Sequence, residues 1–102
     1  MRLEWSRQAR TDIRQLRAYI SQDSPFYARQ FIERLFKRID NLPEFPRMGR
    51  AVPEAEREDI REIFYQGYRI IYRTASDHLL IVTVLHGSQD LAGQENKLWE
   101  EG

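Results

Sequence analysis

The segment that decides the fold is residues 60–86, which read IREIFYQGYRIIYRTASDHLLIVTVLH. It is rich in Ile, Val, Leu and Tyr, which are typical of strands, and two polar pairs interrupt it, Gln66-Gly67 and Ser76-Asp77. A pair of this kind between two strand-like runs predicts a tight turn. We therefore expect an antiparallel meander of three strands at residues 60–65, 68–74 and 79–86.

A two-residue turn at Gln66-Gly67 also fixes the register of the first two strands. It places Tyr65 opposite Tyr68 and, four residues further from the turn, Arg61 opposite Tyr72. Residues that stand opposite one another in an antiparallel pair lie on the same face of the sheet. Arg61 is therefore expected on the face that carries these tyrosines.

The last strand of the meander is apolar on both of its faces. One face is expected to carry Leu80, Val82 and Val84. Continuing the register through the second turn sets Ile71 opposite Val82, so His86 is expected on this same face, opposite to the face of Arg61. Strands that are apolar on both sides are normally covered on both sides. Since one helical hairpin covers one face, either the Pro-rich loop and the tail or a bound partner chain must cover the other.

Two amphipathic helices precede these strands. Ser6 can cap the first helix, and apolar residues then recur at intervals of three and four up to Ile20. Ser24 and Pro25 fit the cap and first turn of the second helix, whose apolar face continues to Leu42. The short connection makes the helices antiparallel neighbours. We expect hairpin and sheet to share one core that contains Leu16, Ile20, Phe31, Leu35, Ile39 and Ile70.

Together these elements predict an α+β fold, an antiparallel β-sheet with an N-terminal two-helix hairpin packed on one face (β-α-α-β-β-β). Leu3–Trp5 is the candidate first strand, at an edge of the sheet. Pro43–Pro53 is expected to form a rigid loop, because its prolines cannot continue a helix. The apolar anchors expected for this loop are Phe45, Met48 and Val52.

The composition excludes several classes of protein. The chain has no cysteine, which rules out a disulfide scaffold, a thiolate zinc site and a cysteine nucleophile. No apolar run approaches the roughly 20 residues of a membrane span, and the N-terminus lacks the apolar h-region of a signal peptide. We expect a single soluble domain over residues 1–102, in the cytoplasm, with no metal and no cofactor. Residues 88–102 are expected to be its tail, either a short helix or a mobile arm.

Charge is unevenly distributed, although the formal net charge is zero. Residues 1–50 carry eleven basic and six acidic side chains, and residues 51–102 carry five basic and ten acidic ones. Arg10, Arg14 and Arg17 form a stripe at helical spacing. This stripe is interpreted either as ordinary solvated helix surface or as a basic face for an acidic partner.

No sequence motif of the common enzyme classes is present, so the candidate catalytic residues are isolated side chains. His86 ends a strand, where its imidazole could act as a general acid or base or could simply bond to the backbone. Arg61, Arg69 and Arg73 could stabilise phosphate charge. Alternatively, Arg69 and Arg73 could pair with Glu62, which the register places between them on the same face.

Three tyrosines of the meander offer a further possibility. Tyr65, Tyr68 and Tyr72 are interleaved with Arg61, which resembles a surface on which nucleobases stack. Tyrosines in strands also pack in cores, and both interpretations stay open. The residues that we expect to contact a partner or a target are basic and apolar side chains of the first helix and the sheet: Arg10, Arg14, Arg17, Arg61, Arg69, Arg73, Tyr65, Leu80, Val82 and Val84.

Short motifs along most of the chain, between residues 5 and 91, resemble those of the ParE/RelE toxin superfamily and follow the same order. The first helix carries Trp5-Ser6, Ala9, Asp12-Ile13 and Tyr19-Ile20. The second helix and the loop carry Ser24-Pro25, Leu42 through Pro46, Gly49-Arg50 and Pro53-Glu54. The strands carry Ile60-Arg61-Glu62, Gly67-Tyr68-Arg69-Ile70, Tyr72-Arg73 and Val84-Leu85-His86-Gly87. Each motif is weak alone, and their combination identifies the chain as a member of this superfamily.

The resemblance implies a bacterial toxin of a type II toxin–antitoxin system, of the kind that stabilises plasmids. The toxin of such a system is held inactive in a hetero-oligomer by its cognate antitoxin. RelE-like members cut mRNA on the ribosome with a cluster of basic residues and no metal. ParE-like members inhibit DNA gyrase and lack that cluster.

The end of the chain favours the ParE-like branch. Ser88 and Gln89 stand where the nucleases place further basic residues, and no tyrosine follows Tyr72. We therefore expect inhibition of DNA gyrase without chemistry of the toxin's own. The first alternative is a metal-independent, ribosome-dependent mRNA endoribonuclease that uses Arg61, Arg69 and His86. The second is a degenerate toxin that acts only as an antitoxin-binding module.

Overall fold

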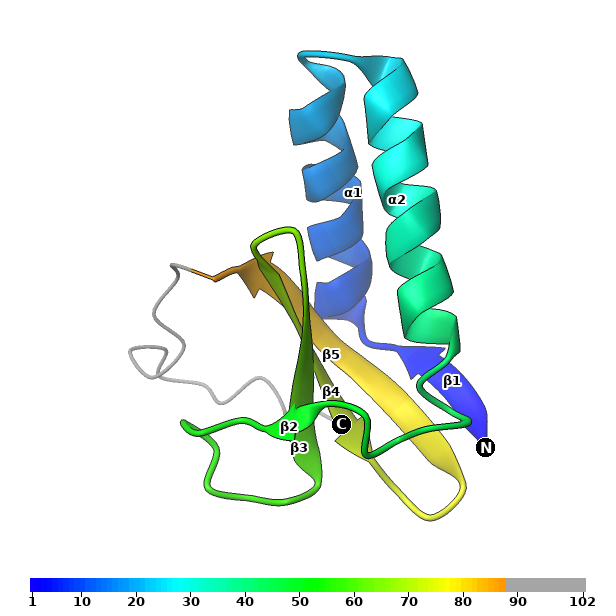
Figure 1. Cartoon of the computed structure of the whole chain (residues 1–102), viewed down its shortest axis with the longest axis vertical. Coiled ribbons are helices and arrows are strands. Elements are labelled where there is room, and N and C mark those ends of the chain that lie inside the picture. The colour runs from blue at the N-terminus through cyan, green and yellow to red at the C-terminus, as the bar shows by residue number, and fades with distance from the viewer. Residues whose placement is uncertain (88–102) are drawn as a thin grey trace.

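The computed structural model describes residues 1–87, so the tail expected at residues 88–102 lies outside the described residues. The described elements are β1 (Arg2–Trp5), α1 (Arg7–Ser21), α2 (Pro25–Asp40), β2 (Arg50–Ala51), β3 (Ile60–Tyr65), β4 (Tyr68–Thr74) and β5 (His78–His86). The strands form one sheet in the order β1-β5-β4-β3-β2 (Figure 1). Strand β1 runs parallel to β5, and all other neighbours are antiparallel. The α+β fold and its helical hairpin are thus as predicted, and β1 makes the sheet a mixed one.

The two helices begin where their capping residues predict. The Ser6 hydroxyl accepts a hydrogen bond from the Ala9 amide, and the Ser24 hydroxyl accepts one from the Tyr27 amide, with Pro25 in the first turn. The helices form an antiparallel hairpin whose far end projects beyond the sheet (Figure 1). No helix in residues 1–87 is long and apolar enough to cross a membrane.

The main core lies between this hairpin and one face of the sheet, which we call the helix face. All six predicted core residues belong to it, with Ile20 partly buried at its margin. Leu35 and Ile39 of α2 and Ile70 of β4 are fully shielded from solvent. The periodicity of three and four in the helices and of two in the strands therefore identified the correct faces.

The turn between β3 and β4 has the backbone that its sequence requires. Gln66 and Gly67 both have positive φ, at 51° and 85°, as a two-residue hairpin turn matched to the strand twist demands. Tyr65 pairs with Tyr68, and Arg61 pairs with Tyr72. The predicted register of β3 and β4 is confirmed.

The predicted register between β4 and β5 is wrong beyond the middle of the strands. Ile71 pairs with Thr83 rather than with Val82, because Val82 is the extra residue of a β-bulge between Ile81 and Thr83. A bulge shifts every following side chain to the opposite face. Leu80 and Val82 therefore lie away from the helices, whereas Val84 packs in the main core.

The same shift corrects the position of His86. His86 pairs with Tyr68, which lies on the helix face together with Arg61 and Tyr72. His86 and Arg61 are therefore on the same face of the sheet, and the predicted placement on opposite faces is wrong. The bulge could not be predicted, because β5 is apolar on both sides and either register buries apolar groups.

A second, smaller core covers the face opposite to the helices. It contains Val52, Ile60, Ile71, Leu80, Val82 and Leu85, with Ala55 packed against it. Val52 belongs to the predicted loop of residues 43–53 and Ala55 follows it, so the end of this loop covers part of the second face. The tail, which the same expectation named, lies outside the described residues. Of the three predicted loop anchors, only Val52 is buried, since Phe45 is 57% exposed and Met48 is 49% exposed.

Tyr72 anchors the first part of this loop instead. Its buried hydroxyl accepts a hydrogen bond from the Gly49 amide (3.0 Å) and donates one to the Pro46 carbonyl (2.8 Å). A Cβ at Gly49 would collide with the backbone of Glu62 and with the Tyr72 hydroxyl, so only glycine fits there. The loop is therefore fixed by polar contacts to a buried tyrosine.

Candidate functional site

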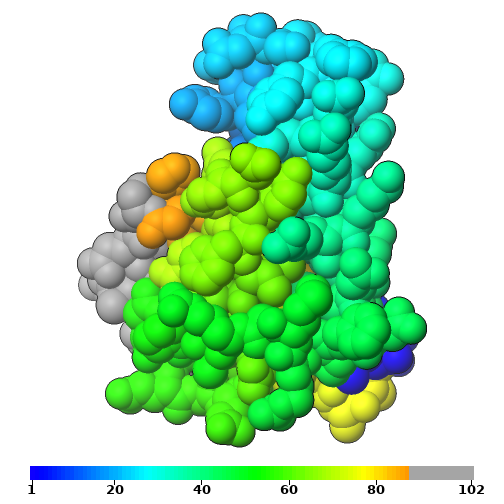
Figure 2. Space-filling model, viewed as in Figure 1, coloured from blue at the N-terminus to red at the C-terminus, as the bar shows by residue number. Residues whose placement is uncertain are grey.

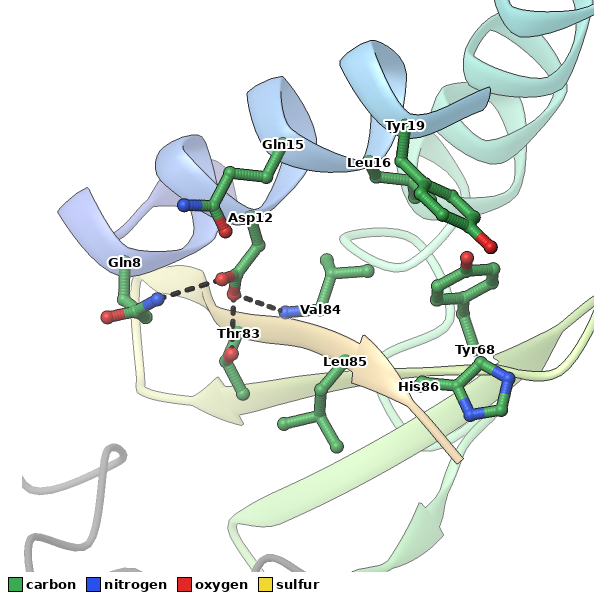
Figure 3. A pocket seen from close by; sticks show the side chains of 10 residues that line it. All are labelled: Gln8, Asp12, Gln15, Leu16, Tyr19, Tyr68, Thr83, Val84, Leu85 and His86. Atoms are coloured by element: carbon green, nitrogen blue, oxygen red, sulfur yellow. Dashed lines mark hydrogen bonds between the residues drawn. The ribbon is translucent and has the colours of Figure 1, made fainter. Parts of the chain in front are cut away.

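An open cleft of about 320 Å³ lies between α1 and the ends of β4 and β5 (Figure 3). Its residues come from segments far apart in sequence, because α1 packs across β5. The lining residues are Gln8, Asp12, Gln15, Leu16, Tyr19, Tyr68, Thr83, Val84, Leu85 and His86. Three predicted candidates line this cleft, namely His86, Val84 and Tyr68. Asp12 and Tyr19 also line it, and no role in a site had been predicted for them.

Asp12 joins α1 to β5 at the floor of this cleft. One carboxylate oxygen accepts hydrogen bonds from the Thr83 hydroxyl (2.6 Å) and the Val84 amide (2.9 Å). The other accepts one from the Gln8 side chain (2.8 Å). Strand β1 stops pairing with β5 at Ile81, so Asp12 satisfies a backbone donor that the sheet leaves unpaired. This carboxylate is therefore occupied by structural hydrogen bonds.

Two tyrosines and His86 form the polar, aromatic end of the cleft. The Tyr68 and His86 rings meet edge to face, with centroids 5.5 Å apart. The hydroxyls of Tyr19 and Tyr68 point toward one another (Figure 3). Burial, and to a smaller degree Tyr19, raises the pKa of Tyr68 above its ordinary value of about 10. Tyr68 is therefore protonated at neutral pH and can donate a hydrogen bond, but it cannot serve as a base.

Within residues 1–87, the lining of the cleft contains no arginine and no lysine, so these residues offer no cation to a phosphate. Arg61 lies on the same face but four residues further along β3, a separation of about 14 Å along the strands at ~3.4 Å per residue. Its guanidinium donates a hydrogen bond to the Gly49 carbonyl (2.8 Å). Among the described residues, His86 and Arg61 are thus not brought together.

Arg69 lies on the opposite face, in a buried network of charges. Its guanidinium donates to Glu62 (2.6 Å) and, through two nitrogens, to both carboxylate oxygens of Glu54 (3.0 Å each). Arg50 binds the second oxygen of Glu62 at 2.8 Å. The predicted pairing of Arg69 with Glu62 is therefore present, and Arg69 is only 6% exposed.

The pKa values in this network follow from these contacts. The hydrogen bonds from Arg69 lower the pKa of Glu54, and the bonds to Glu54, with those to Glu62, raise the pKa of Arg69. Both groups are therefore charged at neutral pH, and the network fastens the loop that carries Glu54 to the sheet. Nearby, Arg57 chiefly, and Arg73 to a smaller degree, lower the pKa of Asp59.

The remaining candidates differ in accessibility. Arg10, Arg14 and Arg17 lie exposed on α1, where a partner can reach them. Tyr65 is half-buried, and its ring packs edge to face against Phe31. Leu80, Val82 and Val84 are at most 7% exposed. Residues 1–87 contain no cluster of side chains suited to hold a metal ion.

A mixed sheet with a helical hairpin on one face, and a cleft where α1 crosses the last strand, define a class of small α+β proteins. Solved structures of this class include the chromosomal ParDE TA system from P. aeruginosa, which matches with a TM-score of 0.70 over 84% of this chain and 95% of that chain at 18% identity. The toxin–antitoxin complex RelBE2 from Mycobacterium tuberculosis matches with a TM-score of 0.54 over 83% and 95% at 21% identity. At these sequence identities, the similarity to both structures shows a shared fold.

Sequence comparison identifies the family. The model of the ParE toxin of type II toxin–antitoxin system, parDE, matches residues 3–91. Toxin RelE2 of Caulobacter vibrioides is 32% identical over 85 residues, which cover 83% of this chain and 93% of that protein. Putative toxin Y4kP of Sinorhizobium fredii is 31% identical over 90 residues, which cover 86% and 90%. The chain belongs to the ParE toxin family of type II toxin–antitoxin systems.

Proposed function

We propose that the protein inhibits DNA gyrase and that a cognate antitoxin neutralises it in a hetero-oligomer. The observation that carries the proposal is the position of the cations that a ribonuclease would need. Arg69 is bonded to Glu62 and Glu54 within the fold, and none of the residues that the structure describes places a cation in the lining of the cleft that contains His86. In this proposal residues 1–102 form one toxin domain that acts in the cytoplasm.

Metal-free RNA cleavage requires a base for the 2′-hydroxyl, an acid for the leaving oxygen and a cation for the phosphorane, all within reach of one phosphate. The separation of Arg61 from His86 by about 14 Å along the sheet does not meet this condition. Inhibition of gyrase requires only a surface that binds the enzyme. The exposed arginines Arg10, Arg14 and Arg17 are available for such a contact.

An antitoxin partner is supported by the two solved structures of similar fold, which are a ParDE TA system and the toxin–antitoxin complex RelBE2. Charge supports it as well, because the helical hairpin at residues 7–40 carries eight basic and four acidic side chains. A basic face of this kind favours an acidic partner. Within the proposal, the antitoxin covers surface that the toxin otherwise uses against its target.

The test uses purified toxin in two parallel assays. In a gyrase supercoiling and cleavage-complex assay, we expect inhibition with trapped DNA breaks. In a reaction with translating ribosomes, followed by primer extension on the mRNA, we expect intact mRNA. Arg61→Ala should leave the inhibition of gyrase within about threefold of wild type. Codon-phased mRNA cuts, with gyrase unaffected, would overturn the proposal.

A ribosome-dependent ribonuclease is the second candidate, because the cleft does hold two groups able to exchange protons, His86 and Tyr68. For this function, Arg61→Ala or His86→Ala should slow mRNA cleavage. Loss of one charge-stabilising group in a site of this kind costs about 10²–10³ in rate. A folded toxin that acts in neither assay, but binds the antitoxin, would instead be an antitoxin-binding module.

A further inference from the structure

Helix α1 carries four arginines and a single acidic residue, and the arginines form one stripe along it. At about 3.6 residues per turn, positions 7, 10, 14 and 17 fall within about a quarter of the helix circumference and span about 15 Å of its length. All four side chains are exposed to solvent. We call Arg7, Arg10, Arg14 and Arg17 the arginine stripe.

The one acidic residue of α1, Asp12, lies on the side of the helix opposite to the arginine stripe. Its carboxylate accepts hydrogen bonds from Thr83 and Val84 of β5. Asp12 therefore fixes the rotation of α1, with one side of the helix on the sheet and the arginine stripe in solvent. Figure 2 shows that the end of the hairpin, drawn blue to cyan, stands clear of the strands. A large partner can reach that end without meeting the sheet.

Within residues 1–87, no carboxylate neutralises the arginine stripe. None of its four guanidinium groups forms a salt bridge in this part of the chain, and Arg14 donates a hydrogen bond to the Thr11 hydroxyl (3.2 Å). Like charges three and four residues apart repel one another and destabilise a helix. A row of such charges, without an acidic neighbour on the same surface, indicates a face that an anionic partner neutralises.

Helix α2 also carries four basic residues, but it arranges them differently. On its exposed surface Arg29, Glu33, Lys37 and Asp40 follow one another at intervals of four, four and three residues. Opposite charges at this spacing support one another, which is typical of a solvated helix surface. Since α1 lacks this alternation, the contrast favours the interpretation of the arginine stripe as a basic face for an acidic partner.

The surroundings of the arginine stripe indicate a phosphate backbone as the partner. Within α1, the large exposed apolar side chain is Tyr19, which lines the cleft with His86 on another side of the helix. Protein interfaces are centred on buried aromatic or apolar anchors, and the arginine stripe contains none. Contact through cations alone is typical of proteins that bind the backbone of a nucleic acid.

We infer that the arginine stripe of α1 binds the phosphate backbone of duplex DNA without reading its sequence. A duplex carries one negative charge for about every 1.7 Å of its axis, so a stripe about 15 Å long meets several phosphates at once on any sequence. This inference rests on the proposed function for the choice of DNA over RNA, because gyrase holds duplex DNA. It adds that the toxin contacts the DNA of that complex directly.

The test measures binding of the purified toxin to a fluorescent DNA duplex of about 30 base pairs by anisotropy, without gyrase. At about 100 mM salt we expect a Kd of about 1–100 µM, the usual range of sequence-independent binding. A second duplex of unrelated sequence should bind within about threefold of the first. Four phosphate contacts predict a slope of about −3 to −4 when the logarithm of the association constant is plotted against that of the salt concentration.

Two double variants that remove the same charge separate the arginine stripe from the net charge of the protein. Arg10→Gln with Arg14→Gln should raise the Kd for DNA at least about tenfold and make the salt slope shallower by about 2. Arg29→Gln with Lys37→Gln, on α2, should leave the Kd within about threefold of wild type. Arg10→Lys with Arg14→Lys keeps both charges and should also stay within about threefold. All four positions are exposed, so the variants should fold, which circular dichroism checks.

The outcomes distinguish the DNA contact from the proposed function. Absence of DNA binding up to about 100 µM toxin, or an equal loss of affinity in the two Gln double variants, overturns the contact. Gyrase inhibition by the same protein then leaves the proposed function in place. Binding of an RNA duplex of the same sequence at least about tenfold more tightly than DNA overturns the choice of DNA. A toxin that binds DNA through the arginine stripe, but leaves gyrase active, supports the contact and overturns the proposed function.

Discussion

At the scale of single residues, Asp12 and Arg69 show how far side-chain roles can be foreseen. The pairing of Arg69 with Glu62 could be predicted, because a two-residue turn fixes which strand residues share a face. The contact of Asp12 with Thr83 and Val84 could not. It spans more than seventy residues, and it depends on where β1 stops pairing with β5.

The pair of Arg69 and Glu54 yields a prediction about pH. Arg69 lowers the pKa of Glu54, whose ordinary value is 4.5, so the ionised carboxyl stabilises the folded state. For a group whose pKa is lower in the folded state, this stability is present above the unfolded pKa and is lost as the pH falls through the folded pKa. Wild type should therefore be more stable than Glu54→Gln at pH 7.

The difference in the free energy of unfolding between wild type and Glu54→Gln should shrink as the pH falls below about 4.5. Protonation then removes the charge of Glu54 in the wild type as well. Urea unfolding at pH 7, 5, 4 and 3 measures it. Glu44→Gln, at an exposed carboxylate of the loop, is the control and should match wild type throughout. A difference that stays constant from pH 7 to pH 3 would show that the charge of Glu54 contributes nothing.

At the scale of elements, the helices and the β3–β4 hairpin were predictable because their determinants are local. A serine cap, a proline in the first turn and a pair with positive φ each act within a few residues. The parallel pairing of β1 with β5 and the bulge at Val82 depend on packing between distant segments. Apolar residues on both faces of β5 leave the register of that strand open in the sequence.

Leu35 tests the packing between the hairpin and the sheet. It is fully buried in the main core, so Leu35→Ala removes apolar contacts and leaves a cavity. The free energy of unfolding should fall by about 2–5 kcal/mol. Lys37→Ala, at an exposed position of the same helix, should change it by less than about 0.5 kcal/mol. Urea unfolding gives both values, and a loss below about 0.5 kcal/mol for Leu35→Ala would contradict this packing.

At the scale of the whole molecule, the uneven charge distribution has a consequence for association with the proposed antitoxin. The chain is neutral overall, but the hairpin at residues 7–40 bears a surplus of four positive charges. Exposed charges act over about 30 Å at 10 mM salt and over about 8 Å at 150 mM. The hairpin should therefore attract an acidic partner from a distance only when the salt concentration is low.

We expect the association rate constant to fall at least about tenfold between 20 and 500 mM salt, with a smaller change in the dissociation rate constant. Stopped-flow or surface-binding kinetics with the purified antitoxin measure both. Replacing Arg10, Arg14 and Arg17 together by Gln should flatten the dependence on salt, because these exposed side chains supply three of the hairpin's positive charges. Arg47→Gln, at an exposed position of the loop, should have a smaller effect. An association rate that is insensitive to salt in wild type would show that the basic hairpin does not guide the antitoxin to the toxin.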